Sequence, residues 1–90
     1  MIKCPDGYSL ILVESFKSTE KNHRYPIEIR PLLNQVFPSD LLVECSSRMR
    51  DNYPVGTVFR ICAQWKQKQD CRPHLYTSYR WSFEVIDISA

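Results

Sequence analysis

Two stretches of the sequence decide the fold, TVFRICAQWK at residues 57–66 and LYTSYRWSFEV at residues 75–85. In each stretch every second residue is mostly apolar, and several of these residues are aromatic. Successive side chains of a β-strand point to opposite faces, so a period of two is typical of half-buried antiparallel strands. The pattern predicts a hairpin with one face in the core. The large aromatic residues expected on that inward face are Phe59, Trp65, Tyr79, Trp81 and Phe83. Two tryptophans are bulky for so small a core, so the alternative is that one of them reaches the rim, where its N–H can find a partner.

The segments on either side of the first strand read as a turn and a loop. Residues 53–56 have proline second and glycine fourth, which favours a type I turn leading into the strand. Residues 67–74 are polar and too long for a tight hairpin turn, so they predict an exposed loop.

Three further strands are predicted before the hairpin. The first covers about residues 8–14 and could extend to Phe16; it has apolar residues on both faces and is expected to be buried on both. The second covers residues 25–30, with Glu28 and Arg30 outward. Pro26 cannot donate to a strand ladder, which favours a sheet edge there. The third is the short run at residues 41–45.

Helix signals are few. Residues 31–37 predict one helical segment, because Pro31 suits a first helical position and Pro38 would end the helix. Residues 46–52 are ambiguous between a loop and a single helical turn capped by Ser46 or Ser47.

The chain is therefore expected to be one small β-rich domain over residues 1–90. We predict a mainly β fold, a small antiparallel curved sheet or partly open barrel of 4–5 strands, SH3-like or OB-like, with at most one short helix. A curved meander tends to close because closure removes exposed edges. An α+β open sheet with one helix against it is the alternative.

The N-terminus has no signal-peptide pattern, and the apolar run at residues 10–13 is too short for a secretory or membrane segment. A cytoplasmic protein without membrane contact is expected, in which the cysteines at 4, 45, 62 and 71 stay reduced. Cys45 fits a buried position, whereas Cys62 falls on the outward phase of its strand and is expected to be the more accessible.

No motif indicates a cofactor, a metal or a catalytic site. The chain has only two glycines, so a phosphate-binding glycine loop and a dinucleotide fingerprint are excluded. A zinc site would need Cys71 and His74 together with two other cysteines, and ordinary thiols are the favoured interpretation. A cysteine with His23 or His74 is the only pair resembling a nucleophile and base. We therefore expect no enzyme, no cofactor and no metal.

Positive charge gathers in the C-terminal half. The net charge is +2, yet residues 45–81 carry seven Lys and Arg against two acidic residues. If the odd positions of the hairpin face the core, cations and one tyrosine share the outward face and the adjoining loop. The residues predicted to bind are Arg60, Lys66, Lys68, Arg72, Tyr76 and Arg80.

Three functions remain open on the sequence. The favoured one is a non-catalytic interaction module that binds a protein partner, a second copy of the chain included, through its basic sheet face or an edge strand. The alternative is a nucleic-acid-binding barrel that uses the basic hairpin. A Cys/His-dependent enzyme or a zinc site receives the least support.

Overall fold

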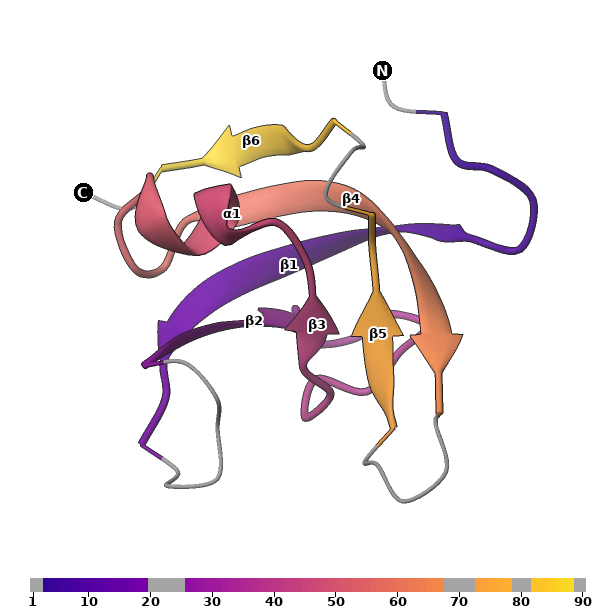
Figure 1. Ribbon diagram of the computed structural model, residues 1–90, viewed down its shortest axis with the longest axis horizontal. Coiled ribbons are helices and arrows are strands. Elements are labelled where there is room, and N and C mark those ends of the chain that lie inside the picture. Colours follow the sequence, from indigo (N-terminus) through magenta and orange to yellow (C-terminus); the bar gives the residue numbers. More distant parts are fainter. Residues whose placement is uncertain (1–2, 20–25, 68–72, 79–81, 89–90) are drawn as a thin grey trace.

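The computed structural model describes residues 3–19, 26–67, 73–78 and 82–88. Its elements are β1 (Ser9–Lys17), β2 (Ile27–Pro31), β3 (Val43–Glu44), α1 (Ser47–Asp51), β4 (Val58–Lys66), β5 (His74–Tyr76) and β6 (Glu84–Asp87). The six strands form one sheet in the order β2-β1-β4-β5-β3, and β6 pairs with β4 outside this path (Figure 1). The fold is mainly β with one short helix, as predicted. The sheet is open and has six strands, where four or five were expected.

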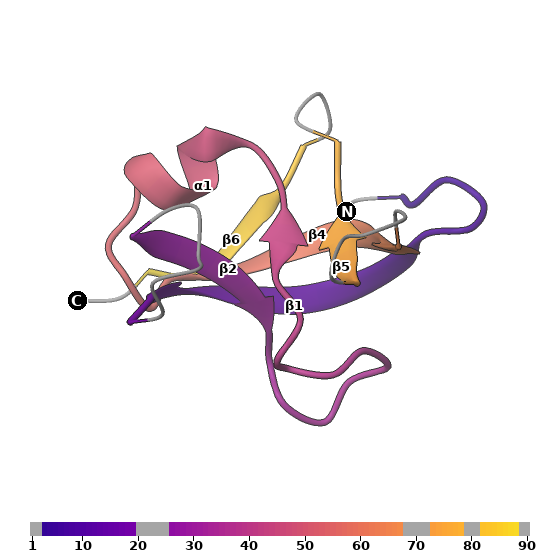
Figure 2. The ribbon, with the colours of Figure 1, turned by 60° about the horizontal axis from the view of Figure 1, so that its bottom comes forward.

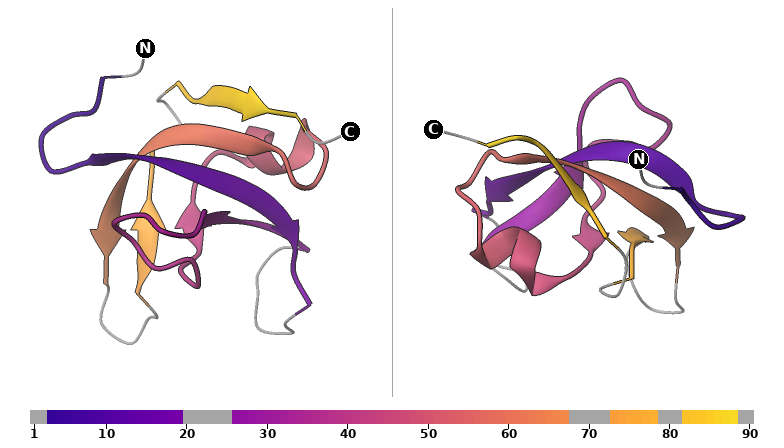
Figure 3. Two further views of the ribbon diagram at one scale, coloured as in Figure 1. Left: turned by 180° about the vertical axis from the view of Figure 1, so that it is seen from behind. Right: turned by 90° about the horizontal axis from the view of Figure 1, so that it is seen from above.

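Strand β4 is the centre of the sheet. β1 pairs antiparallel with it from Ser9–Ala63 to Glu14–Val58, and Figure 3 shows β1 running along it. On its other side β4 has two partners, β6 near its start and β5 near its end, both antiparallel.

The second predicted strand is in fact two strands, β5 and β6. Continuing the Trp65–Leu75 register would place residue 81 opposite Phe59, but Val85 lies there instead. The register therefore shifts by four residues between the two pairings, which one uninterrupted strand over residues 75–85 cannot do. The hairpin between β4 and β5 is confirmed.

The sequence predicted the strand at one edge of the sheet but not the pairing at the other edge. β2 is at one end, as the proline at residue 26 predicted. β3 is at the other end and pairs parallel with β5, Val43 beside Leu75 and Glu44 beside Tyr76. This parallel pair corrects the expectation of a wholly antiparallel sheet.

Phe59 is at the centre of the core and is fully buried. Its ring meets Tyr53 and Phe83 edge-on, with centroids 5.3 and 5.5 Å away, a favourable arrangement of aromatic rings. The buried apolar residues around it come from five strands and the helix: Ile11, Val13, Ile29, Val43, Met49, Ile61, Ala63 and Leu75. The inward phase predicted for Phe59 and Phe83 is confirmed, whereas Tyr79 and Trp81 lie outside the described residues.

Two burial predictions for β1 and β2 are wrong. β1 buries only one face, because Ile11 and Val13 are in the core while Leu10 is 45% exposed. Glu28 was expected outward and is buried, and α1, which carries the buried Arg50, packs against the same strand.

The helix forms at residues 47–51 and not at 31–37. The Ser46 hydroxyl accepts a hydrogen bond from the Arg48 amide, which caps the helix as one interpretation predicted. Pro31 instead ends β2, and the segment after it projects as a loop (Figure 2). No helix among the described residues is long and apolar enough to cross a membrane.

The turn before β4 is displaced by one residue from the prediction. The Thr57 amide donates to the Pro54 carbonyl, so the turn covers residues 54–57. Gly56, third in this turn, has φ +96°. A positive φ at the third position belongs to a type II turn, where glycine carries no steric penalty.

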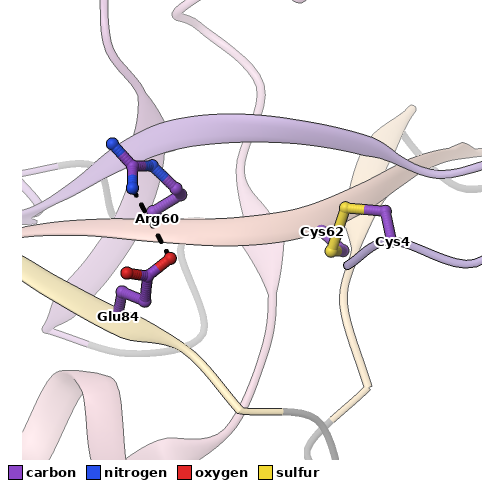
Figure 4. The surroundings of a disulfide bond; sticks show 4 residues. All are labelled: Cys4, Arg60, Cys62 and Glu84. Carbon is purple, nitrogen blue, oxygen red and sulfur yellow. Dashed lines mark ion pairs between the residues drawn. A yellow bond between two sulfur atoms is a disulfide. The ribbon is translucent and has the colours of Figure 1, made fainter. Parts of the chain in front are cut away.

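A disulfide between Cys4 and Cys62 fastens the N-terminal segment onto β4, with the two Cα atoms 5.5 Å apart (Figure 4). The expectation of reduced cysteines is wrong for this pair. Cys62 is also only 3% exposed. The outward phase of Cys62 was correct, but the segment carrying Cys4 covers that part of the face.

Candidate functional site

The far end of the β4–β5 hairpin gathers the polar and aromatic residues that the sequence singled out. Gln64 is opposite Tyr76, and Lys66 is opposite His74. Because alternate side chains share a face, these four residues lie on the outer side of the sheet. β3 extends the same row, since Glu44 is beside Tyr76 in the parallel register.

Two side-chain contacts organise this corner. The Lys66 ammonium nitrogen lies 5.7 Å from the centre of the Tyr76 ring, within the range of a cation–π interaction. His74 Nε2 is 3.1 Å from Glu44 Oε2. Each cationic or ionisable group thus has a neighbour, while Lys66 and Glu44 remain exposed.

Trp65 is at the same end of β4 but in the core-side phase of the strand, on the opposite face from Lys66 and Tyr76. It was expected in the core with Phe59, yet it is 45% exposed, while its cross-strand neighbour Leu75 is fully buried. Burial along β4 ends at Ala63, so the last two residues of the strand extend beyond the core. The position of Trp65 next to the polar loop is the sequence signal that would have revealed this. We call this end of the hairpin the hairpin site: Glu44, Lys66, His74 and Tyr76 on the outer face, and Trp65 on the opposite face.

Arg60 is not part of the hairpin site. It lies six positions before Lys66 on β4, which is roughly 20 Å along an extended strand. Arg60 Nη1 is 3.5 Å from Glu84 Oε1, its cross-strand neighbour on β6 (Figure 4). That oxygen is buried and accepts no hydrogen bond within the described residues. Arg60 therefore serves first as the counter-charge of Glu84.

The six predicted binding residues are thus divided. Lys66 and Tyr76 come together, and Arg60 is placed elsewhere. Lys68, Arg72 and Arg80 lie outside the described residues.

The described thiols offer no nucleophile. Cys4 and Cys62 are joined, so neither is a thiol. Burial raises the pKa of the Cys45 thiol to about 11, against the opposing effect of Arg50, whose Nη1 is 3.8 Å from the sulfur. Because the thiolate is the reactive form, Cys45 is expected to be inert at neutral pH. Cys71 lies outside the described residues.

The residues that the structure describes include no group of three or more His, Cys, Asp or Glu residues placed to bind a metal ion. Nor does the chain match any protein-family model, curated protein or solved structure. The hairpin site offers one phenol, one cation and a His–Glu pair on the outer face, and one indole on the opposite face.

Proposed function

We propose that this domain is a non-catalytic interaction module that binds a protein partner through the hairpin site. The observation that carries the proposal is that Trp65 is 45% exposed at the end of β4 that also carries, on the opposite face, the Lys66–Tyr76 pair. Tryptophan and tyrosine are enriched among the residues that dominate protein–protein binding energy, because they bury a large area and keep a polar group for hydrogen bonding.

The charges of the site support a protein partner over nucleic acid. The hairpin site combines Lys66 with Glu44, and Arg60 further along β4 faces Glu84. A phosphate backbone is attracted by a surface that is positively charged throughout. Mixed charges together with aromatic residues are typical of protein interfaces.

Nucleic-acid binding is the second candidate, and the Lys66–Tyr76 pair is what favours it. An aromatic ring on which a base can stack, beside a cation for the phosphate, is the usual unit of single-strand binding. Lys68, Arg72 and Arg80 are the other cations that the sequence predicts for this alternative.

The barrel form belongs to the proposal as well. The two ends of the strand order share one core, because Ile29 of β2 and Val43 of β3 belong to the same buried cluster. A sheet curved so far is what a partly open barrel of the SH3-like or OB-like kind requires. Its edge strands are a second route by which a partner strand could add.

The disulfide indicates the redox state of the cellular compartment in which the protein resides. Thiols stay reduced in the cytosol, and structural disulfides persist in oxidising compartments. The Cys4–Cys62 bond therefore argues against the cytoplasmic location expected from the sequence and favours an oxidising one. Alkylation of intact cells before lysis tests this, since free thiols at Cys4 and Cys62 would contradict it.

The binding proposal is tested by affinity capture from native lysate with quantitative mass spectrometry. Trp65→Ala is compared with Leu10→Ala, a matched control because both side chains are 45% exposed. We expect a protein retained by the parent and by Leu10→Ala to be depleted at least tenfold with Trp65→Ala. Equal retention by all three would contradict the proposal.

Nuclease treatment and a labelled single-stranded oligonucleotide separate the two candidates. A protein partner survives nuclease treatment. Oligonucleotide binding that weakens steeply with salt and requires Lys66 would favour the nucleic-acid alternative.

A further inference from the structure

The loop between β2 and β3 exposes two aliphatic side chains almost completely. Leu33 is 74% and Val36 is 72% exposed, the highest values among the large apolar residues that the structure describes. Figure 2 shows this segment projecting away from the sheet. The two residues are therefore presented to solvent on a convex feature.

The loop is fastened to the sheet by Gln35, which lies between these two residues. Its Oε1 accepts a hydrogen bond from the Leu12 amide at 2.7 Å, and its Nε2 donates to the Leu12 carbonyl at 2.6 Å. Nε2 also lies 3.2 Å from the Leu32 carbonyl. One side-chain amide thus occupies the place of a neighbouring strand along β1, just beyond the point where β2 ends.

Two further features fix the shape of the loop. Asn34 has φ +65°, a left-handed conformation that reverses the chain between Leu33 and Gln35. Phe37, directly after Val36, packs against the core. The exposed pair is thus held between anchored residues, so its exposure is built into the fold.

We propose that Leu33 and Val36 form an apolar knob that inserts into a concave apolar pocket of a partner protein. The knob is defined by these two residues and shares none with the hairpin site, so the proposal does not rest on that site. A fixed pair loses little conformational entropy on binding, which makes it a suitable anchor.

Charge distinguishes the partner from a lipid surface. No Lys or Arg occurs between Arg30 and Arg48, while Asp40 on the same loop is exposed. Membrane-binding loops draw on cations for anionic headgroups, and an acidic loop would be repelled. The same charge fits a pocket whose rim carries Lys or Arg.

Shape and area disfavour a second copy of the chain on this loop. Two convex knobs bury little surface against each other, whereas a stable symmetric interface needs about 800 Å² from each partner. Two side chains cannot provide that area. Both side chains can be buried when the knob enters a pocket on the larger surface of another protein.

The test is site-specific photo-crosslinking in the native host, with a photoreactive residue at position 33, 36 or 55. Val55 is the control, an apolar turn residue that is 42% exposed. We expect positions 33 and 36 to yield the same discrete product with another protein, and position 55 to yield none. The crosslinked partner peptides should map to an apolar pocket with basic residues at its rim. Leu33→Ser should lower the yield from position 36 at least fivefold.

Other outcomes overturn the proposal. In the crosslinking experiment these are the same product from position 55, a product with a second copy of this chain, or no discrete product. In a separate assay, the proposal fails if the protein sediments with phosphatidylcholine–phosphatidylserine vesicles and Leu33→Ser abolishes this. A folding role is checked separately. The pair Leu33→Ser and Val36→Ser should leave the urea midpoint unchanged, whereas Phe37→Ser should lower it. An equal fall in both would show that the knob serves the fold.

Discussion

Cys4 and Cys62 are 58 positions apart and are covalently joined, which closes all of β1, β2, β3 and α1, and about half of β4, into one ring. A cross-link over so long a loop removes much of the freedom of the unfolded chain. We predict that Cys4→Ser lowers the free energy of unfolding by about 2–4 kcal/mol. Urea denaturation with and without reductant measures this. Cys4→Ser should make the midpoint insensitive to reductant, and a parent protein equally insensitive would contradict the prediction.

The Cys45 thiol should make stability depend on pH in the alkaline range. Its pKa is raised by burial from 9.0 to about 11 in the folded protein. Below pH 9 the thiol is protonated in both states, and as the pH rises towards 11 only the unfolded state loses the proton. Stability should therefore fall over that interval, by about 1–2 kcal/mol once partial exposure is allowed for. Denaturation at pH 8 and pH 11 should show this loss in the parent beyond that in Cys45→Ala, and identical pH profiles would refute it.

The contact between Gln35 and Leu12 should be worth more than an ordinary surface hydrogen bond. Gln35→Ala leaves the Leu12 amide and carbonyl without their side-chain partner, which we expect to lower stability by about 1–3 kcal/mol. Hydrogen exchange of the Leu12 amide should accelerate. Asn34→Gly is the control, because glycine accepts φ +65° without strain. An unchanged exchange rate in Gln35→Ala would show that the contact does not order the loop.

Phe59 and Trp65 point to the same side of β4, yet truncating each to alanine should change the free energy of unfolding by very different amounts. Phe59 is fully buried between Tyr53 and Phe83, so Phe59→Ala should cost about 3–5 kcal/mol. Trp65→Ala should cost within about 0.5 kcal/mol, because Trp65 lies beyond the core. Thermal unfolding followed by circular dichroism compares them. Similar losses would mean that Trp65 belongs to the core.

The alternation of residues 57–66 was enough to identify β4 and the inward side of Phe59, Ile61 and Ala63. It could not show where the core ends, because a period of two continues through Trp65 whether or not anything packs against it. In the same way the alternation of residues 75–85 persists across β5 and β6 and hides the change in register between them.

Tertiary partners explain the remaining differences. Glu28 is buried although its strand phase was expected to point outward, and Cys62 is buried where Cys4 is bonded to it. No local sequence pattern records either. Pro31 begins a plausible helix in the sequence, but the Leu32 amide hydrogen-bonds to the Leu12 carbonyl on β1. For the hairpin site, the sequence indicated Lys66 and Tyr76 and missed Trp65, Glu44 and the His74 contact. The last two depend on the parallel pairing of β3 with β5.

That parallel pair implies an order of folding. β5 pairs with β4 across a short connection in the chain, whereas Val43 and Leu75 are 32 positions apart. Loop closure over such a separation is slow compared with a local hairpin. We expect pulse-labelling hydrogen exchange to find the amides of Leu75 and Thr77, which donate to Leu42 and Glu44, protected last. Glu44 would then be the last member of the hairpin site to reach its place, and the surface would be complete only when the whole sheet is.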